Sequence, residues 1–253
     1  MREFIKNILS FFIVKANFDC DYKNAIFMIG HMRAGTTALT NILCSRKDVS
    51  GFGEAHVNYS GKYSLGRLYL SLMKNNGIKK SSYIFDKILH SRYDSNATDD
   101  FFNSKGIFII REPSESIKSI QKLFEMHGSE EYKNLESIVS YYNQRLDSMV
   151  FLWSKYNKNN RIFIPYQRLI NETDAVLDEM SSFLEITPKI INEYAPSKVS
   201  RHGAGDPMFA SKHSKIVKPE VPSGRGNFEI SEKLLSMANE KYNDALKVFQ
   251  KIE

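Results

Sequence analysis

Two glycines, Gly30 and Gly35, bound a short turn that constrains the fold more than any other feature of the chain. The preceding run, residues 25–29, reads Ala-Ile-Phe-Met-Ile and is typical of a buried strand. The following residues, 36–43, have the pattern of an amphipathic helix. In such a turn successive N–H groups can point inward, and the helix adds its unpaired amides and the positive end of its dipole. We therefore expect an anionic ligand to bind at this turn.

The four residues between the two glycines match the spacing of the phosphate loop in nucleoside-triphosphatases. Those loops place a lysine directly after the second glycine, whereas this chain has Thr36 there. The nearest cation is Arg33, inside the turn. The missing lysine argues against ATP hydrolysis, and an ordinary strand-to-helix connection would also account for two glycines at this spacing.

A second junction of the same kind lies at residues 106–119. An apolar run leads into Arg111, Pro113 suits the first turn of a helix, and Ser119 lies two turns further along. If the two strands are parallel, their carboxyl ends form one rim, which is where open α/β sheets bind ligands. We therefore expect Arg111 and Ser119 on the same rim as the glycine turn.

Short apolar runs alternate with helical patterns along the chain. The runs that we predict as strands are residues 25–29, 83–85, 107–110 and 162–164. Apolar positions three and four apart predict helices over 135–153 and 176–184, and a last helix runs from about Ser231 to Phe249. This alternation predicts an α/β fold with a mostly parallel central sheet flanked by helices. A chain of 253 residues that is 42% hydrophobic can bury one substantial core, so we expect a single domain over residues 1–253.

Together the two junctions resemble the sulfotransferase family, whose members take a sulfuryl group from 3′-phosphoadenosine 5′-phosphosulfate (PAPS) and release 3′,5′-adenosine bisphosphate (PAP). The resemblance implies the P-loop NTPase-like sulfotransferase fold, with PAPS as the donor. Arg111 with Ser119 looks like the family's 3′-phosphate pair. The residues that look like the family's 5′-phosphosulfate loop are Arg33, Ala34, Gly35, Thr36, Thr37 and Ala38.

The resemblance also implies catalytic residues. Glu54 and His56 follow the predicted helix that begins at residue 36, at the distance where heparan-type sulfotransferases carry Glu-x-His. Both side chains point the same way if the segment is extended. We favour Glu54 as the base that takes the acceptor's proton, and the opposite assignment to His56 stays open. Asp86-Lys87 is similar to the family's Asp/Glu-Lys, and Lys87 is expected to neutralise charge on the sulfuryl group and the leaving phosphate. Taken alone, a loop glutamate is usually solvated and a lysine usually lies on the surface.

Residues 202–209 look like the His-x-x-Gly-Asn-Pro loop of carbohydrate sulfotransferases, with Asp206 in place of the asparagine. This resemblance implies donor contacts from His202, Gly203 and Gly205. The loop and the Glu-x-His pair favour bacterial carbohydrate and heparan-type enzymes as the closest in motif. They therefore favour a carbohydrate or glycan-like hydroxyl as the acceptor.

Composition bounds the partners. The formal net charge of +6 and pI near 9.1 favour anionic partners in general, but no Lys/Arg run with interleaved aromatics is present. We therefore expect a phosphorylated, sulfated nucleotide and no nucleic acid. Two cysteines, Cys20 and Cys44, exclude a disulfide framework, and the histidines have no metal-ligand spacing, so we expect no metal.

The N-terminal stretch from Phe4 to Phe18 is apolar but interrupted by polar residues, including Lys6 and Lys15. It is too short and too polar for a transmembrane span, and no signal-peptide cleavage site is recognisable. We expect a helix over about residues 1–18 that either docks on the domain or makes peripheral contact with a membrane. These features favour a cytoplasmic location.

The sequence thus predicts a PAPS-dependent O-sulfotransferase, with two alternatives. One is a P-loop kinase that uses ATP, which the missing lysine after Gly35 and the Arg111–Ser119 pair disfavour. The other is a non-catalytic glycan- or nucleotide-binding protein of the same fold, which the joint presence of Arg33, Glu54 and Lys87 disfavours.

Overall fold

The computed structural model of the chain describes residues 2–16, 20–75, 77–80, 83–127, 132, 134–195, 214–218 and 229–251. Five parallel strands in these ranges form one sheet in the order β2-β3-β1-β4-β5. The strands are β1 (Ala25–Gly30), β2 (Val49–Ser50), β3 (Tyr83–Ile88), β4 (Lys105–Ile110) and β5 (Arg161–Pro165). The predicted parallel sheet is confirmed, and the short edge strand β2 is an addition.

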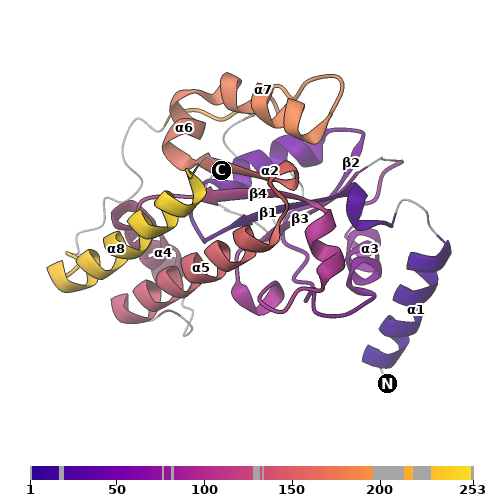
Figure 1. Cartoon of the computed structure of the whole chain (residues 1–253), viewed down its shortest axis with the longest axis horizontal. Coiled ribbons are helices and arrows are strands. Elements are labelled where there is room, and N and C mark those ends of the chain that lie inside the picture. The colour runs from indigo at the N-terminus through magenta and orange to yellow at the C-terminus, as the bar shows by residue number, and fades with distance from the viewer. Residues whose placement is uncertain are drawn as a thin grey trace.

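Helices cover both faces of this sheet (Figure 1). They are α1 (Arg2–Ala16), α2 (Thr36–Ser45), α3 (Ser64–Lys74), α4 (Pro113–His127), α5 (Leu135–Lys155), α6 (Tyr166–Asn171), α7 (Thr173–Leu184) and α8 (Glu232–Phe249). One face carries α2, α6 and α7, and the other carries α3, α4, α5 and α8. No helix of the described residues has the length and apolarity needed to cross a membrane.

The alternation of side chains along β1 decides which face each one meets. Ile26 and Met28 pack under α2, whereas Phe27 and Ile29 join the core on the opposite face. All four side chains are fully buried. Because β1 is the central strand of a sheet with helices on both sides, it tolerates a continuous apolar sequence.

Strand β3 extends beyond the predicted strand 83–85, through two charged residues, Asp86 and Lys87. Both are buried inside the sheet. Each has a polar partner, since the Tyr59 hydroxyl donates to Asp86 at 2.6 Å and Glu54 pairs with Lys87 at 3.1 Å. Buried charges need such partners, and tertiary contacts supply them here. The prediction of this strand from apolar residues alone was therefore too short, because it stopped before the two charged residues.

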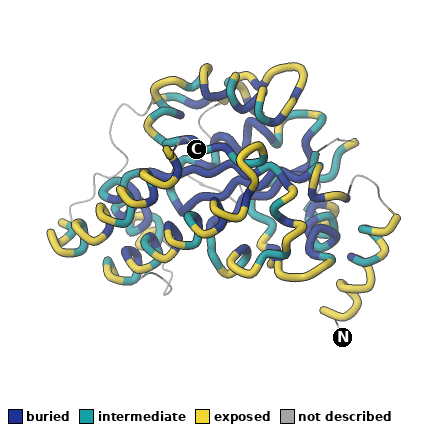
Figure 2. Tube along the Cα trace, viewed as in Figure 1, coloured by how far each residue is buried: buried dark blue, intermediate teal, exposed yellow. Residues whose placement is uncertain are grey.

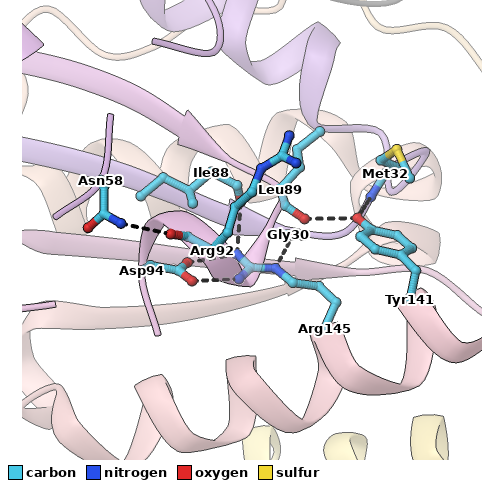
Figure 3. A network of polar contacts seen from close by, with 9 residues as sticks. All are labelled: Gly30, Met32, Asn58, Ile88, Leu89, Arg92, Asp94, Tyr141 and Arg145. Carbon is cyan, nitrogen blue, oxygen red and sulfur yellow. Dashed lines mark hydrogen bonds and ion pairs between the residues drawn. The ribbon is translucent and has the colours of Figure 1, made fainter. Parts of the chain in front are cut away.

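A buried ion pair ties the carboxyl ends of β1 and β3 to helix α5 (Figure 3). Two guanidinium nitrogens of Arg145 lie 2.8 and 2.9 Å from the carboxylate oxygens of Asp94. The same guanidinium donates to the carbonyls of Gly30 at 2.8 Å and Ile88 at 2.9 Å. The side chains of Arg145 and Asp94 are both fully buried. One cation therefore sets the position of two adjacent strand ends.

Tyr141, one helical turn before Arg145 on α5, also links α5 to the ends of β1 and β3 (Figure 3). The Tyr141 hydroxyl accepts from the backbone N–H of Met32 at 2.8 Å and donates to the carbonyl of Leu89 at 2.8 Å. Met32 lies in the glycine turn, and Leu89 directly follows β3. Helix α5 thus supports the turn and the end of β3 together.

We expect Arg145→Met to lower the free energy of unfolding by ~3–5 kcal/mol, because it leaves the Asp94 carboxylate buried without its cation. Urea unfolding followed by circular dichroism measures this loss. The matched control is Lys241→Met, which breaks the exposed Lys241–Asp147 pair on α8 and α5 and should cost under ~1 kcal/mol. Equal losses in the two variants would contradict a structural role for the buried pair.

Candidate functional site

The glycine turn presents the start of α2 without a side-chain cap. Gly35 is the N-cap residue, with a left-handed φ of 84°, and as a glycine it provides no side-chain cap to the helix. A Cβ at Gly35 would lie 2.7 Å from the ring of Tyr166, so both the backbone angle and the space require glycine. The first amides of an α-helix have no intrahelical partner. The start of α2 can therefore receive an anion.

The start of α4 differs from the start of α2. The Glu112 carboxylate accepts from the backbone N–H of Ser114 at 3.0 Å and from that of Glu115 at 2.9 Å. This carboxylate satisfies and neutralises the end of α4, which would otherwise attract anions as well. An anionic group can therefore bind at the start of α2, whereas the amides at the start of α4 are already occupied by Glu112.

The structure brings together three residues that the sequence assigned to separate phosphates. Arg33 Nε donates to the Ser119 hydroxyl at 2.7 Å, and Arg111 Nη1 donates to the Arg33 carbonyl at 3.4 Å. Arg33 takes a left-handed backbone conformation with a φ of 67°, which is uncommon for a residue other than glycine. The predicted 5′ loop and the predicted 3′ pair therefore form one hydrogen-bonded cationic cluster.

Arg111 is buried, and its guanidinium also contacts Tyr166 and Glu115. Its guanidinium carbon lies 4.3 Å from the centre of the Tyr166 ring, and Nη2 pairs with the Glu115 carboxylate at 3.2 Å. Tyr166 therefore contacts both Arg111 and the space above Gly35. A phosphate that bound Arg111 would compete with Glu115, since both are anions that bond the same donor group.

An uncharged His31 connects the glycine turn to the backbone of Arg111 through two hydrogen bonds. Its Nδ1 donates to the carbonyl of Met32 at 2.8 Å, and its Nε2 accepts from the backbone N–H of Arg111 at 3.0 Å. Burial is the main cause that lowers the pKa of His31 to about 4; the cations of Arg111 and Arg145 act in the same direction, and the two backbone hydrogen bonds act against it. The imidazole is therefore uncharged at neutral pH, and this one tautomer satisfies both backbone groups.

Glu54 and Lys87 form an ion pair beside the same rim. Glu54 Oε1 lies 3.1 Å from Lys87 Nζ, and the two side chains are 15% and 2% exposed. Lys87 pairs in register with Met28 of β1, whose side chain packs against α2. Because side chains at matched register share a face of the sheet, Lys87 points to the face that carries α2. The predicted Glu54 and Lys87 therefore do lie together.

Asp86 points to the other face and holds the Glu54 loop in place. Its carboxylate accepts from the backbone N–H of Ala55 at 2.8 Å and from the Tyr59 hydroxyl at 2.6 Å. Burial raises the pKa of Asp86 to about 7, and the Glu54 charge adds to this rise, against the hydrogen bonds that lower it. Asp86 fixes the residue next to Glu54 and so acts on its position.

His56 does not share the environment of Glu54. It is exposed, has a left-handed φ of 53°, and its ring centre lies 5.5 Å from that of Tyr93. His90, also near the rim, packs against Tyr93 and Tyr141. His56 therefore lies at the surface beside an aromatic ring, whereas the Glu54 carboxylate is largely buried.

Three predicted donor residues, His202, Gly203 and Gly205, lie outside the described residues. Ala34, Thr36 and Ala38 are buried in and behind the loop, and Thr37 is half-buried. Among the residues that the structure describes, no group of three or more His, Cys, Asp or Glu side chains could hold a metal ion.

Several residues that shape the site escaped the sequence analysis. Tyr142 of α5 donates its hydroxyl to the Arg111 carbonyl at 2.7 Å. Arg145 lies among the buried positions of α5. A cation within the apolar face of this helix was a sequence signal that could have identified it. Tyr166 had no such signal, because its partners Gly35 and Arg111 are far away in the sequence.

We expect His31→Gln to flatten the loss of stability below neutral pH. A folded pKa depressed below the unfolded value means that stability is lost as pH falls from about 6.5 towards 4. The imidazole should account for about 2–3 kcal/mol of that loss at pH ~4.5. Glutamine can accept from Arg111 N–H and does not titrate. Urea unfolding at several pH values compares the parent with the His31→Gln variant. The same pH dependence of the free energy of unfolding in both would contradict a neutral, buried His31.

Residues 23–226 match the sulfotransferase domain family. Among solved structures, the sulfotransferase domain from the curacin biosynthetic pathway has a TM-score of 0.60 at 15% identity, covering 87% of this chain and 96% of that chain. The sulfotransferase domain from the Synechococcus PCC 7002 olefin synthase has a TM-score of 0.61 at 17% identity, covering 88% and 96%.

Mouse sulfotransferase SULT7A1 complexed with PAP has a TM-score of 0.54 at 13% identity, covering 95% of this chain and 90% of that chain. No curated protein matches the chain. The structural likeness establishes the shared P-loop-like fold. Since the family match spans most of the sequence, the chain belongs to the sulfotransferase domain family, whose members transfer sulfate.

Proposed function

We propose that the protein is a PAPS-dependent O-sulfotransferase with Glu54 as its base. The observation that carries this proposal is the presence of two charge sets at one sheet edge. One is the cationic cluster of Arg33, Arg111 and Ser119, and the other is the largely buried Glu54–Lys87 pair. Sulfuryl transfer needs both a clamp on an anionic donor and a base beside it.

The donor clamp fits a nucleotide with phosphates at two positions. The uncapped start of α2 and the Arg33 side chain suit the 5′-phosphosulfate. Arg111 and Ser119 suit the 3′-phosphate, which distinguishes PAPS from ATP. Tyr166 and His31 fix the glycine turn relative to Arg111, because each contacts both.

PAPS, when bound, supplies the sulfuryl group and a phosphate leaving group. The acceptor oxygen forms a bond to sulfur, the bond from sulfur to the bridging oxygen breaks, and the acceptor's proton passes to the Glu54 carboxylate. Once protonated, Glu54 no longer neutralises Lys87. The Lys87 ammonium can then stabilise the negative charge that develops on the leaving oxygen.

Glu54 is preferred to His56 on the grounds of burial and support. Glu54 is largely buried and paired with Lys87, and its loop is fixed by the bond from Ala55 to Asp86. His56 is exposed and its ring lies near Tyr93. A base must be held within hydrogen-bond reach of the proton that it takes, and Glu54 is the better held of the two.

A carbohydrate or glycan-like hydroxyl is our proposed acceptor. The support is the resemblance of residues 202–209 and of the Glu-x-His segment to carbohydrate sulfotransferases. Incubation with sulfur-labelled PAPS and a panel of glycans, phenols and lipid alcohols tests it, and labelling of phenols alone would overturn it. The cytoplasmic location and the single domain stay predictions.

The competing enzymatic function is ATP-dependent phosphoryl transfer. Isothermal titration with PAP and with ATP–Mg²⁺ distinguishes the two, since the chain lacks the lysine of ATP-binding loops. Tighter binding of ATP–Mg²⁺ than of PAP would contradict PAPS as the donor. Tight PAP binding without labelling of any acceptor would instead favour a non-catalytic protein.

We expect Arg111→Ala to weaken PAP binding by ~1.5–3 kcal/mol, the usual worth of a hydrogen bond to a charged group. Isothermal titration measures this change. Adenosine 5′-phosphosulfate lacks the 3′-phosphate and is the control ligand, for which affinity should hardly change. Equal losses for both ligands would assign Arg111 a purely structural role.

We expect Glu54→Gln to lower turnover by ~10²-fold or more while PAP affinity stays unchanged, because the amide keeps the shape but cannot take the proton. His56→Ala is the matched comparison and should have the milder effect. Turnover is measured by sulfur transfer from labelled PAPS to the acceptor that the panel identifies. The assignment of the base is wrong if His56→Ala abolishes turnover and Glu54→Gln leaves it within a few-fold.

A further inference from the structure

Within the described part of the chain, helix α1 packs on the rest of the molecule through one side. Ser10 is fully buried where α1 crosses α3, and a Cβ at Gly66 would lie 2.4 Å from the Ser10 carbonyl oxygen. Arg67 of α3 donates to the Asn7 side chain and pairs with Glu3 at 3.0 Å. These contacts fix which side of α1 faces the protein.

An apolar stripe on α1 has no packing partner among the residues that the structure describes. Figure 2 shows most of the helix as exposed. The stripe, which we call the α1 stripe, consists of Phe4 (68% exposed), Ile5 (49%), Ile8 (41%), Leu9 (46%) and Phe12 (60%). Its members recur at the intervals of one helix face. A contiguous exposed apolar stripe of this kind marks an interaction surface.

The charge of the same part of the molecule is strongly positive. Residues 3–16 and 60–75 contain five cations, Lys6, Lys15, Lys62, Arg67 and Lys74, and one carboxylate, Glu3, a net +4 out of the chain's +6. Glu3 is occupied by Lys6 and Arg67. Lys15, Lys62 and Lys74 are exposed. They have no ion-pair partner among the described residues.

We propose that the α1 stripe and the cations around it bind the surface of an anionic lipid bilayer. An apolar helix face inserts at the boundary between headgroups and acyl chains, and neighbouring lysines attract anionic headgroups. A second copy of the chain would bring the same positive charge against this surface and repel it. A bilayer satisfies both the apolar and the cationic components.

Co-sedimentation of the full chain with vesicles tests the proposal. We expect binding to vesicles of phosphatidylcholine with phosphatidylglycerol, weaker binding at high salt, and little binding to phosphatidylcholine alone. Phe4→Ser/Phe12→Ser should reduce binding to anionic vesicles by about tenfold or more, because it removes the two largest apolar side chains of the stripe. Lys62→Glu/Lys74→Glu should reduce it mainly at low salt.

The matched control is Phe151→Ser/Met237→Ser, which removes two apolar side chains that are exposed to a similar extent on α5 and α8. This variant should bind vesicles like the parent. The proposal is overturned if the parent does not bind anionic vesicles or if Phe4→Ser/Phe12→Ser binds equally well. It is also overturned if sedimentation velocity shows a dimer that this variant dissociates, with no vesicle binding, since the stripe would then be a self-contact.

Discussion

The ion pair between Arg145 and Asp94 positions the strand ends from which both parts of the site begin. Gly30, whose carbonyl Arg145 bonds, starts the glycine turn, and Ile88, bonded by the same side chain, directly follows Lys87. Neither ion reaches solvent. Burying both charges is tolerable because the bidentate pair and the two carbonyls satisfy the guanidinium. Arg145 of α5 therefore helps to set the distance between the glycine turn and the Glu54–Lys87 pair.

Around this anchor, uncharged groups support the charged ones. His31, kept neutral by burial, and the Tyr142 hydroxyl hold the backbone of Arg111 from two sides. At the helix ends the arrangement is selective, because Glu112 neutralises the start of α4 while Gly35 leaves the start of α2 without a side-chain cap. The result is one preferred place for the anionic end of a ligand.

The alternation of β3 gives adjacent residues different tasks. Lys87 points towards the face of α2 and pairs with Glu54, and Asp86 points to the opposite face and bonds the amide of Ala55. The Glu54 loop is thus held from both sides of one strand. Charged residues inside a parallel strand would be costly without these partners, and their presence here indicates a site more than a stable core.

The sequence by itself determined the parallel α/β sheet and the glycine turn, because periodicity and turn chemistry are local properties. Through the resemblance of its motifs it also predicted Arg33, Glu54, Lys87, Arg111 and Ser119 as site residues. Only the tertiary structure decided that Arg33 bonds Ser119, that β3 continues through Asp86 and Lys87, and that Arg145, His31 and Tyr166 connect the loops. Those contacts join residues far apart in the sequence. The free energy of burying a charge or a polar group depends on partners that the fold alone brings near.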